Sequence, residues 1–267
     1  MQGAEAIESL SDSAGALDGR SSEVATSREV ELEEANRELA EASAAEATRW
    51  AADTFGPRLV LSSSFGAQSA VMLHLVSQHA PGTPVIFIDT GHLFPETYRF
   101  AHDLSERLRL DLRVFSPKLT AAHQEALYGR LWEQGEEGVA EYLRINKVEP
   151  MQRALRELGA VGWLAGLRAN QTEHRAGLDR VTMQGGRYKV HPILHWRQED
   201  IDAYLDAHDL PLHPLVEQGY RSIGDTHSTL PTLPGQDPRE GRLLGQKREC
   251  GIHLSDDENK SLTSSKL

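Results

Sequence analysis

The sequence predicts an α/β fold, a doubly wound and mostly parallel sheet with additional N-terminal helices. Two observations carry this prediction. Short apolar segments alternate with longer amphipathic segments through the middle of the chain, as they do in repeated strand–helix units. The first apolar segments also end in polar loops that contain glycine, and parallel sheets bind their ligands at such loops. We therefore expect a ligand site at the carboxyl ends of the strands.

The strand predictions rest on short apolar segments bounded by turn residues, and Gly185-Gly186 marks a hairpin between the last two. The predicted strands are Arg58–Ser62, Pro84–Ile88, Asp111–Phe115, Gly162–Leu167, Thr182–Gln184 and Arg187–His191. The helix predictions rest on amphipathic spacing, and Pro95 suits the first turn of a helix. The predicted helices are Gln68–His79, Pro95–Arg109, Glu149–Leu158 and Arg197–His208.

Helical composition also covers Glu29–Phe55, ahead of the first strand, as one long helix or two short ones. Along the whole chain we expect three parts. Residues 1–25, rich in Ser, Ala, Gly and Glu, form a disordered N-terminus, and residues 26–241 form the α/β core with its N-terminal helices. Residues 242–267 form a mobile C-terminal segment. The candidate inward positions of the N-terminal helices are Leu32, Leu39, Ala42, Trp50 and Ala51.

The composition excludes several classes of protein. The chain has 267 residues, a formal net charge of −12 and a single cysteine. No apolar segment approaches the ~20 residues that span a bilayer, and no secretory signal is visible. One cysteine cannot form an intrachain disulfide, so we expect a cytoplasmic protein in a reducing compartment.

Cys250 is the candidate nucleophile. It stands in the segment Lys247-Arg248-Glu249-Cys250-Gly251-Ile252-His253, where two cations and a histidine favour a thiolate. The alternative is a small buried hydrophobe, the commonest role of a free cysteine, but the segment is polar and close to a chain end. We interpret Cys250 as a nucleophile.

The loop after the first strand is a candidate anion site. Ser62, Ser63 and Ser64 offer hydroxyl donors, Gly66 allows a tight turn, and Gln68 stands where the helix begins. Phosphate or sulfate would fit such a cradle, although a merely polar strand–helix turn is an equal alternative from this loop alone. The loop is not a Walker A motif, which ends in Gly-Lys-Ser/Thr.

Two more groups of polar residues follow. The second strand ends in Asp89-Thr90-Gly91, where a nucleotide's base or ribose could meet main-chain groups, or where Asp89 could simply cap a turn. Lys147 and Arg168 could hold phosphate oxygens, or they could be surface salt-bridge partners. Residues 144–189 contain nine Lys/Arg against four Asp/Glu. On an acidic protein, such a cluster suits a small polyanion better than a nucleic acid.

Taken together, the motifs resemble the assimilatory phosphoadenylyl-sulfate (PAPS) reductases, members of the adenine-nucleotide α-hydrolase-like superfamily that also contains ATP pyrophosphatases. The matching pieces run in family order over about Glu29–Leu254, and their combination is highly specific. They are Leu61–Gln68 (LSSSFGAQ), Asp89–Phe94 (DTGHLF), Ile145–Met151 (INKVEPM), Ala165–Arg168 (AGLR), Ser222–Thr226 (SIGDT) and Lys247–His253 (KRECGIH).

The resemblance implies a mechanism. The Cys250 thiolate attacks the sulfonate sulfur of PAPS, displaces adenosine 3′,5′-bisphosphate and leaves an S-sulfocysteine. Nearby cations neutralise charge on the leaving group, and His253 assists the thiol or the leaving group, or else caps or packs. The implied substrate-binding residues are Ser62, Ser63, Ser64, Gly66, Gln68, Asp89, Thr90, Gly91, Lys147, Gly166, Arg168, Arg175, Arg242, Lys247 and Arg248.

The cysteine count then decides the second half-reaction. No resolving cysteine is present, so an external dithiol, thioredoxin or glutaredoxin, must release sulfite. Relatives that reduce adenylyl sulfate (APS) carry two cysteine pairs for a [4Fe–4S] cluster. Here the place of the first pair holds Ile145 and Asn146, and Ser222–His227 replaces the second, so we expect no bound cluster or metal. Asp225 and His227 are interpreted as hydrogen-bonding loop residues rather than metal ligands.

Several alternatives stay open. Cluster-free enzymes that act on APS are known, and the 3′-phosphate contact is not identified, with Arg175, Arg180 and Lys189 as candidates. An ATP pyrophosphatase or adenylyltransferase on the same fold would need ATP and magnesium and would have no use for Cys250. A non-catalytic nucleotide sensor would not need a reactive cysteine. The resemblance also implies a homodimer, with no nucleic-acid or membrane partner.

Overall fold

The computed structural model describes residues 32–233, 235–237, 240–242 and 251–253. Within them, six strands form one sheet in the order β3-β2-β1-β4-β6-β5, and only β5 runs antiparallel to its neighbour. The strands are β1 (Leu59–Ser62), β2 (Pro84–Ile88), β3 (Asp111–Phe115), β4 (Gly162–Ala165), β5 (Val181–Gln184) and β6 (Arg187–Val190).

The centre of the sheet is a topological switch point. The chain moves outward from β1 to β2 and β3, then crosses back and adds β4 on the other side of β1. At the carboxyl end of β1, Ser62 pairs in register with Ile86 of β2 and Ala165 of β4. Open α/β sheets bind ligands in the crevice where the strand order reverses in this way. The topology therefore places the predicted loops around one crevice.

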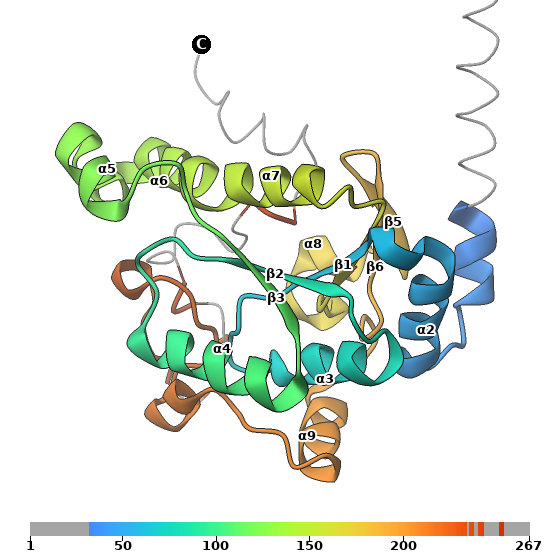
Figure 1. The fold of residues 1–267 in the computed structure, drawn as a ribbon. Coiled ribbons are helices and arrows are strands. Elements are labelled where there is room, and N and C mark those ends of the chain that lie inside the picture. Colours follow the sequence, from blue (N-terminus) through green and yellow to red (C-terminus); the bar gives the residue numbers. More distant parts are fainter. Residues whose placement is uncertain (1–31, 234, 238–239, 243–250, 254–267) are drawn as a thin grey trace, which may run out of the picture.

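Helices cover both faces of the sheet (Figure 1). One face carries α3 (Ala70–His79) and α4 (Pro95–Leu108), and the other carries α7 (Glu149–Glu157). Two-sided burial explains why β1 is a continuous apolar run rather than an alternating one. Leu59 and Leu61 belong to the core cluster that includes α3 and α4, whereas Val60 belongs to the cluster under α7.

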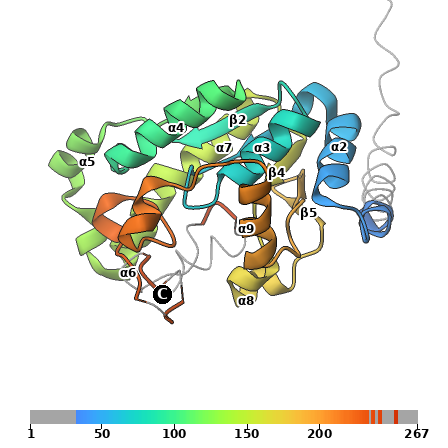
Figure 2. The same ribbon diagram turned by 90° about the horizontal axis from the view of Figure 1, so that it is seen from below.

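Three further helices pack at the periphery. The segment predicted over 29–55 forms two helices, residues 32–38 and α2 (Ala44–Phe55), separated by a turn. Ser43 caps α2 in a capping box with Glu46. The helix α9 (Gln198–Ala207) packs against the outer side of α3 (Figure 2). The predicted inward residues of the N-terminal helices all belong to or pack against the core.

The segment between β3 and α7 had no predicted structure and is helical. It contains α5 (Ala121–Tyr128) and α6 (Gly135–Leu143), and a π-helical turn (Arg144–Val148) joins α6 directly to α7. A short helix, α8 (Glu173–Ala176), follows β4. The remaining 3₁₀ turns of the described residues are Gly56–Arg58, Leu131–Glu133, Ala169–Gln171, Pro214–Gln218 and Thr226–Ser228.

The predicted fold class and the order of the predicted elements are confirmed, and the ends that differ are shifted by one or two residues. The proposed disordered N-terminus and most of the C-terminal segment lie outside the described residues, so the three-part division stays a prediction. Within the described residues, no helix is both long and apolar enough to cross a membrane.

Candidate functional site

The loop between β1 and α3 is held in a fixed shape by its own contacts. The Ser63 hydroxyl accepts a hydrogen bond from the Phe65 backbone N–H at 3.2 Å. Phe65 has a φ of 47°, a left-handed conformation that is rare for a bulky residue and clusters at functional sites. Its fully buried ring packs edge-on against Phe87, with centroids 5.0 Å apart. The packing of the Phe65 ring in the core therefore stabilises the strained backbone conformation of the loop.

This turn leaves donors available just before α3. Among the described residues, no group accepts a hydrogen bond from the backbone N–H of Gly66, Ala67 or Gln68. Consecutive N–H groups at the start of a helix form an anion-binding site, because the helix dipole points in the same direction. From the sequence, an anion-binding loop and a merely polar turn were equal alternatives. The geometry of the loop favours the anion-binding alternative.

The loop after β2 is organised by three hydrogen bonds to side-chain carboxylates. Asp89 accepts hydrogen bonds from the Gly91 N–H at 2.8 Å and from the Tyr98 hydroxyl at 2.6 Å. Burial, together with the hydrogen bond to Asp89, raises the pKa of Tyr98. The buried Thr90 donates to Asp225 Oδ1 at 2.6 Å. Asp89 therefore stabilises the turn, and Thr90 connects this loop to the segment around residue 225.

Asp225 is the central polar group of that connection. Its carboxylate is fully buried and lies 2.7 Å from the Lys147 ammonium. Burial alone would raise the pKa of Asp225, but the charge and hydrogen bond of Lys147, with the hydrogen bond from Thr90, lower it to about 2. Lys147, predicted to hold phosphate oxygens, thus already has a buried carboxylate partner, and its phosphate contact stays a prediction.

Arg168 lies directly beside the anion cradle. Its Nη2 donates to Gln68 Oε1 at 3.0 Å and to Gln198 Oε1 at 3.3 Å, and the residue is 8% exposed. Burial lowers the pKa of Arg168, but an arginine remains charged at physiological pH. Gln171 accepts from the Arg168 backbone N–H and also from Arg175, which is buried. Two predicted cations therefore meet at the carboxyl end of β4.

Arg242 reaches the same crevice from a distant part of the chain. Its Nη1 donates to the Ile223 carbonyl at 2.8 Å and to Ser222 Oγ at 3.3 Å. The guanidinium lies against Gly224, where a Cβ would come within 2.2 Å of Nη2. A Cβ on Gly66 would lie 3.8 Å from the Ile223 carbonyl, so the segment around 223 passes next to the anion cradle. Arg242 is thereby positioned near the predicted phosphate site.

Two aromatic residues that were not predicted, Trp132 and Tyr142, pack around His227, two residues from Asp225. His227 stacks on Trp132 with centroids 3.9 Å apart and meets Tyr142 edge-on at 4.8 Å. Burial lowers the pKa of His227 to about 4, so its ring is neutral at physiological pH. As predicted, Asp225 is a hydrogen-bonding loop residue, whereas His227 makes ring contacts. No group of three potential metal ligands occurs within the described residues.

His253 is the predicted catalytic residue that the structure does describe. Its ring stacks on Trp163 with centroids 5.6 Å apart, and its Nδ1 lies 2.9 Å from the Lys189 ammonium. Lys189, a candidate for the 3′-phosphate, is therefore next to the C-terminal segment. Of the other two candidates, Arg175 lies beside Arg168, and Arg180 donates to the Pro192 carbonyl at 3.1 Å. The remaining predicted residues of this segment, Lys247, Arg248 and Cys250, lie outside the described residues.

Trp163 was not among the site residues predicted from the sequence, although it contacts two of them, Ser62 and His253. Its indole N–H donates to Ser62 Oγ at 2.7 Å, so the first serine of the loop is anchored from β4. The Ser62 hydroxyl still has its own proton to donate to a ligand. A buried tryptophan nearly always needs an acceptor for its N–H, and this rule could have pointed to a polar group beside β4.

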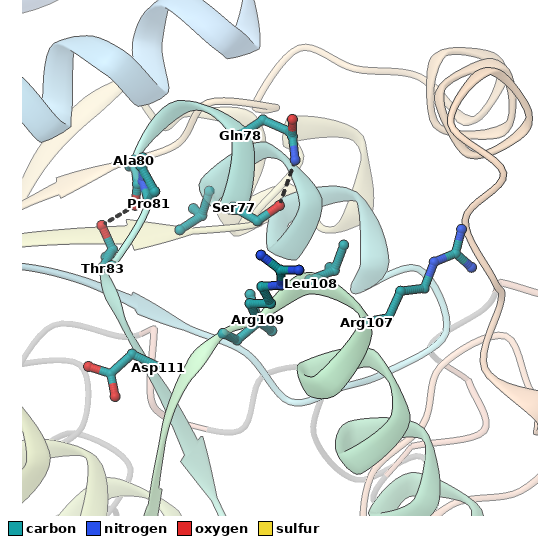
Figure 3. Close-up of a pocket in the computed structure, with 12 residues that line it drawn as sticks. Ser77, Gln78, Ala80, Pro81, Thr83, Arg107, Leu108, Arg109 and Asp111 are labelled. Carbon is teal, nitrogen blue, oxygen red and sulfur yellow. Dashed lines mark hydrogen bonds between the residues drawn. The ribbon is translucent and has the colours of Figure 1, made fainter.

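One cavity of the structure lies away from this site. A cavity of about 330 Å³ lies between the ends of α3 and α4 and the starts of β2 and β3, with Arg107, Arg109 and Asp111 at its wall (Figure 3). The starts of parallel strands lie at the edge opposite the ligand loops. A second cavity, about 210 Å³, lies between α7 and the β5–β6 hairpin and is bounded by Gly251 and Ile252.

Comparison with known proteins agrees with this geometry. Residues 58–231 match the Phosphoadenosine phosphosulfate reductase domain family. A relative named phosphoadenosine 5′-phosphosulfate reductase, from Alkalilimnicola ehrlichii, is 54% identical over 223 residues, 84% of this chain and 91% of the relative. One of the same name from Synechocystis is 51% identical over 246 residues, 91% of this chain and 99% of the relative.

Solved structures give the same result. The crystal structure of PAPS reductase from Candida auris, a phosphate complex, matches with a TM-score of 0.66 and 33% identity, over 74% of this chain and 96% of that one. A Candida glabrata FMN adenylyltransferase matches with a TM-score of 0.53 and 16% identity, over 83% of this chain and 81% of that one, which shows a shared fold alone. The chain therefore belongs to the phosphoadenosine phosphosulfate reductase family and is an oxidoreductase of that family.

Proposed function

We propose that this protein reduces PAPS to sulfite and adenosine 3′,5′-bisphosphate in assimilatory sulfate reduction. The observation that carries the proposal is the meeting of the anion cradle with Arg168 at the switch point of the sheet. Backbone N–H groups and a buried guanidinium together suit a phosphosulfate group better than a neutral ligand. The names of the relatives supply the same substrate.

In the first half-reaction, the Cys250 thiolate attacks the sulfonate sulfur. The bond between that sulfur and the bridging oxygen breaks, and its electron pair leaves with the nucleotide phosphate. Negative charge therefore builds on the leaving group, where we expect Arg168 and Arg242 to stabilise it; their contacts beside the predicted anion cradle support this role. Lys147, Lys247 and Arg248 are the other predicted cations. Cys250 is left as an S-sulfocysteine.

The nucleotide is proposed to lie along the two loops of the crevice. The phosphosulfate group would meet Ser62, Ser63, Ser64, Gly66 and Gln68, and the nucleoside would meet Asp89, Thr90 and Gly91. Support comes from the stiffness of these loops, which Trp163 and Asp225 anchor by hydrogen bonds of 2.7 Å and 2.6 Å. Gly166 lies at the end of β4, where a Cβ would come within 2.9 Å of the Met72 side chain.

In the second half-reaction, an external dithiol restores the enzyme. One of its thiolates attacks Sγ of the S-sulfocysteine, and sulfite leaves with the electron pair of the sulfur–sulfur bond. The second thiol of the reductant then resolves the mixed disulfide, so the reductant supplies both electrons. Because the chain has one cysteine, it cannot perform this step alone. We infer thioredoxin or glutaredoxin as the partner, in the reducing cytoplasm.

Two further parts of the proposal follow from the sequence. An all-cysteine iron–sulfur cluster needs four cysteine ligands, and the chain has one, so we propose that catalysis proceeds without a bound cluster.

The homodimer expected from the family resemblance stays a prediction that light scattering can test. Turnover on PAPS compared with APS tests the nucleotide preference.

The decisive experiment is mass measurement of the protein after incubation with PAPS. We expect one SO₃ group on Cys250, which reduced thioredoxin removes with release of sulfite. The Cys250→Ser variant should form no adduct and release no sulfite, while it still binds adenosine 3′,5′-bisphosphate. An intact wild-type chain that never gains the group, with or without reductant, would exclude this function.

A further inference from the structure

The last three described residues, Gly251–His253, pack against the α7 face of the sheet. Ile252 packs against the apolar cluster between the sheet and α7, a cluster that includes Met151 and Leu155. Its backbone carbonyl accepts a hydrogen bond from Gln184 Nε2 at 2.9 Å. Gly251 and Ile252 line the 210 Å³ cavity beside the β5–β6 hairpin. The segment that directly follows Cys250 thus has specific contacts with the core.

Lys189 is the polar centre of this contact. It is 2% exposed, and it stands opposite Trp163 in the register of β4 and β6. Its ammonium donates to Gln184 Oε1 at 2.6 Å, contacts His253 Nδ1 at 2.9 Å and lies 4.2 Å from the centroid of the Trp163 ring. A lysine ammonium is a donor only, so Nδ1 of His253 must be the acceptor.

Trp163 connects this contact to the nucleotide loop. One edge of its indole donates to Ser62 Oγ, and its face stacks on the His253 ring. A cation placed near the face of a tryptophan is attracted by the ring, which helps to hold the Lys189 ammonium close to both Trp163 and His253. A single buried side chain therefore contacts both the predicted phosphate loop and the segment after the predicted nucleophile.

We propose that Lys189 is a positioning residue for the reaction. With Trp163 and Gln184, it forms a docking platform that holds Gly251–His253 on the sheet, and so limits where Cys250 can be relative to the nucleotide loop. In this role Lys189 acts through His253, and not as the 3′-phosphate contact for which it was one of three candidates. The inference rests on the proposed function of Cys250, but the docking contact can be measured without any substrate.

The same geometry gives His253 a docking role. Its Nδ1 faces Lys189 and its ring faces Trp163, so the imidazole serves as an acceptor and a stacking surface. A docking residue tolerates replacement of its acid–base function if its contacts are kept. A proton-transfer residue would instead show its own step in the pH profile of the rate.

The test uses Lys189→Met, His253→Phe and the double variant in the full-length protein. Methionine keeps the length of the lysine side chain without its charge, and phenylalanine keeps the stacking on Trp163 without the acceptor. Lys118→Met is the matched control, because the Lys118 side chain is 77% exposed. His253→Phe changes only the terminal segment, so it reports on docking even where Lys189→Met lowers the yield of folded protein.

Two readouts are needed. Hydrogen exchange of the peptide that contains residues 251–253 reports docking without substrate, and it should become faster in Lys189→Met and His253→Phe. Single-turnover formation of the SO₃ adduct reports the chemical step, and it should slow by up to about 100-fold, the scale of a small misplacement of reacting groups. The Kd of adenosine 3′,5′-bisphosphate should stay within about twofold, because binding is not the step affected.

The double variant distinguishes a shared role from two separate ones. If Lys189 and His253 act through their mutual contact, the double variant should be no slower than the slower single variant. Wild-type exchange and adduct rates in both single variants would overturn the inference, and so would fully multiplicative losses. If wild-type protein forms no adduct, the proposed function fails instead, while the exchange data still decide whether the segment docks.

Discussion

The carboxylate of Asp225 and the ammonium of Lys147 form a buried ion pair, with Oδ2 and Nζ 2.7 Å apart. The pair joins the π-helical turn before α7 to the segment around residue 225, and Thr90 ties both to the loop after β2. Three segments that are far apart in the sequence are therefore held together by one carboxylate. This junction lies beside the proposed nucleotide site, so its stability determines the shape of that site.

Replacing Asp225 by Asn should destabilise the protein by about 3–5 kcal/mol, because the substitution leaves a buried, uncompensated lysine charge. The pKa of Asp225 is lowered to about 2 in the folded protein, against about 3.9 unfolded. Its contribution is therefore present above about pH 4 and is lost as the pH falls toward 2. Urea unfolding at pH 7 and pH 3 measures both effects.

The matched control is Asp209→Asn, which removes an exposed partner of Arg107. This change should cost less than about 1 kcal/mol, because solvent screens exposed pairs. An Asp225→Asn variant as stable as the Asp209→Asn variant would show that the buried pair contributes nothing.

His191 gives a second prediction about pH. Burial, followed by the charges of Lys189 and Arg175, lowers the pKa of His191 to about 3. The unfolded chain binds this proton near pH 6.5, so acid favours unfolding between about pH 6.5 and 3. In that range, the free energy of unfolding should change by up to about 1.4 kcal/mol per pH unit because of His191, and His191→Gln should remove this change. His102→Gln, at an exposed position, should leave the slope unchanged when urea unfolding is compared at pH 7.5 and 5.

Gly224 should prove necessary for the position of Arg242. A Cβ there would lie 2.2 Å from Arg242 Nη2, so Gly224→Ala must displace the guanidinium. We expect Arg242→Met to lower the rate of sulfite release by about 100-fold, on the scale of losing one charge-stabilising donor. Gly224→Ala should lose part of the same activity with little change in stability.

Gly177→Ala is the control for this substitution, because a Cβ there meets no atom within 4 Å. Equal activity of the two alanine variants would mean that Arg242 does not act from the position that it occupies here.

Arg168→Lys should weaken nucleotide binding while the fold is retained. The guanidinium donates to Gln68 and Gln198 through one nitrogen and has further donors, whereas a lysine is a point charge. Loss of one charge-assisted hydrogen bond predicts about a tenfold higher Kd for adenosine 3′,5′-bisphosphate. Calorimetry measures this Kd. The control is Arg99→Lys, because the Arg99 side chain is 74% exposed. An unchanged Kd in Arg168→Lys would show that Arg168 does not bind the nucleotide.

Much of the fold could be predicted because strand and helix periodicity are local properties. Pro84–Ile88 was predicted at its observed bounds, and the break between residue 38 and Ala44 was one of the two options considered. The helices α5 and α6 were not predicted. The helix α5 is mostly exposed and lacks a strong apolar stripe, and α6 continues through a π-helical turn without the usual end signals.

The candidate site was predicted less evenly. The loop predicted as an anion cradle and Arg168 could be singled out from the sequence because they follow strands directly, where topology places ligands. Trp163 and Tyr98 were not predicted as site residues, because each acts through a hydrogen-bond acceptor that is distant in the sequence or on another element. Trp163 of β4 donates to Ser62 of β1, and Tyr98 of α4 donates to Asp89 in the loop after β2. Lys147 and Lys189 were recognised as important cations, but the sequence could not say that Asp225 and His253 would lie beside them.

The sequence by itself determined the chemistry that depends on counting and on neighbours along the chain. One cysteine means that any S-sulfocysteine must be cleared by a thiol from outside the chain, whatever the fold. Only the tertiary structure decided which charges are paired, because ion pairs and ring contacts between distant residues depend on how the helices pack on the sheet. That packing joined Lys147 to Asp225 and placed His253 on Trp163, and it left Arg168 facing the anion cradle.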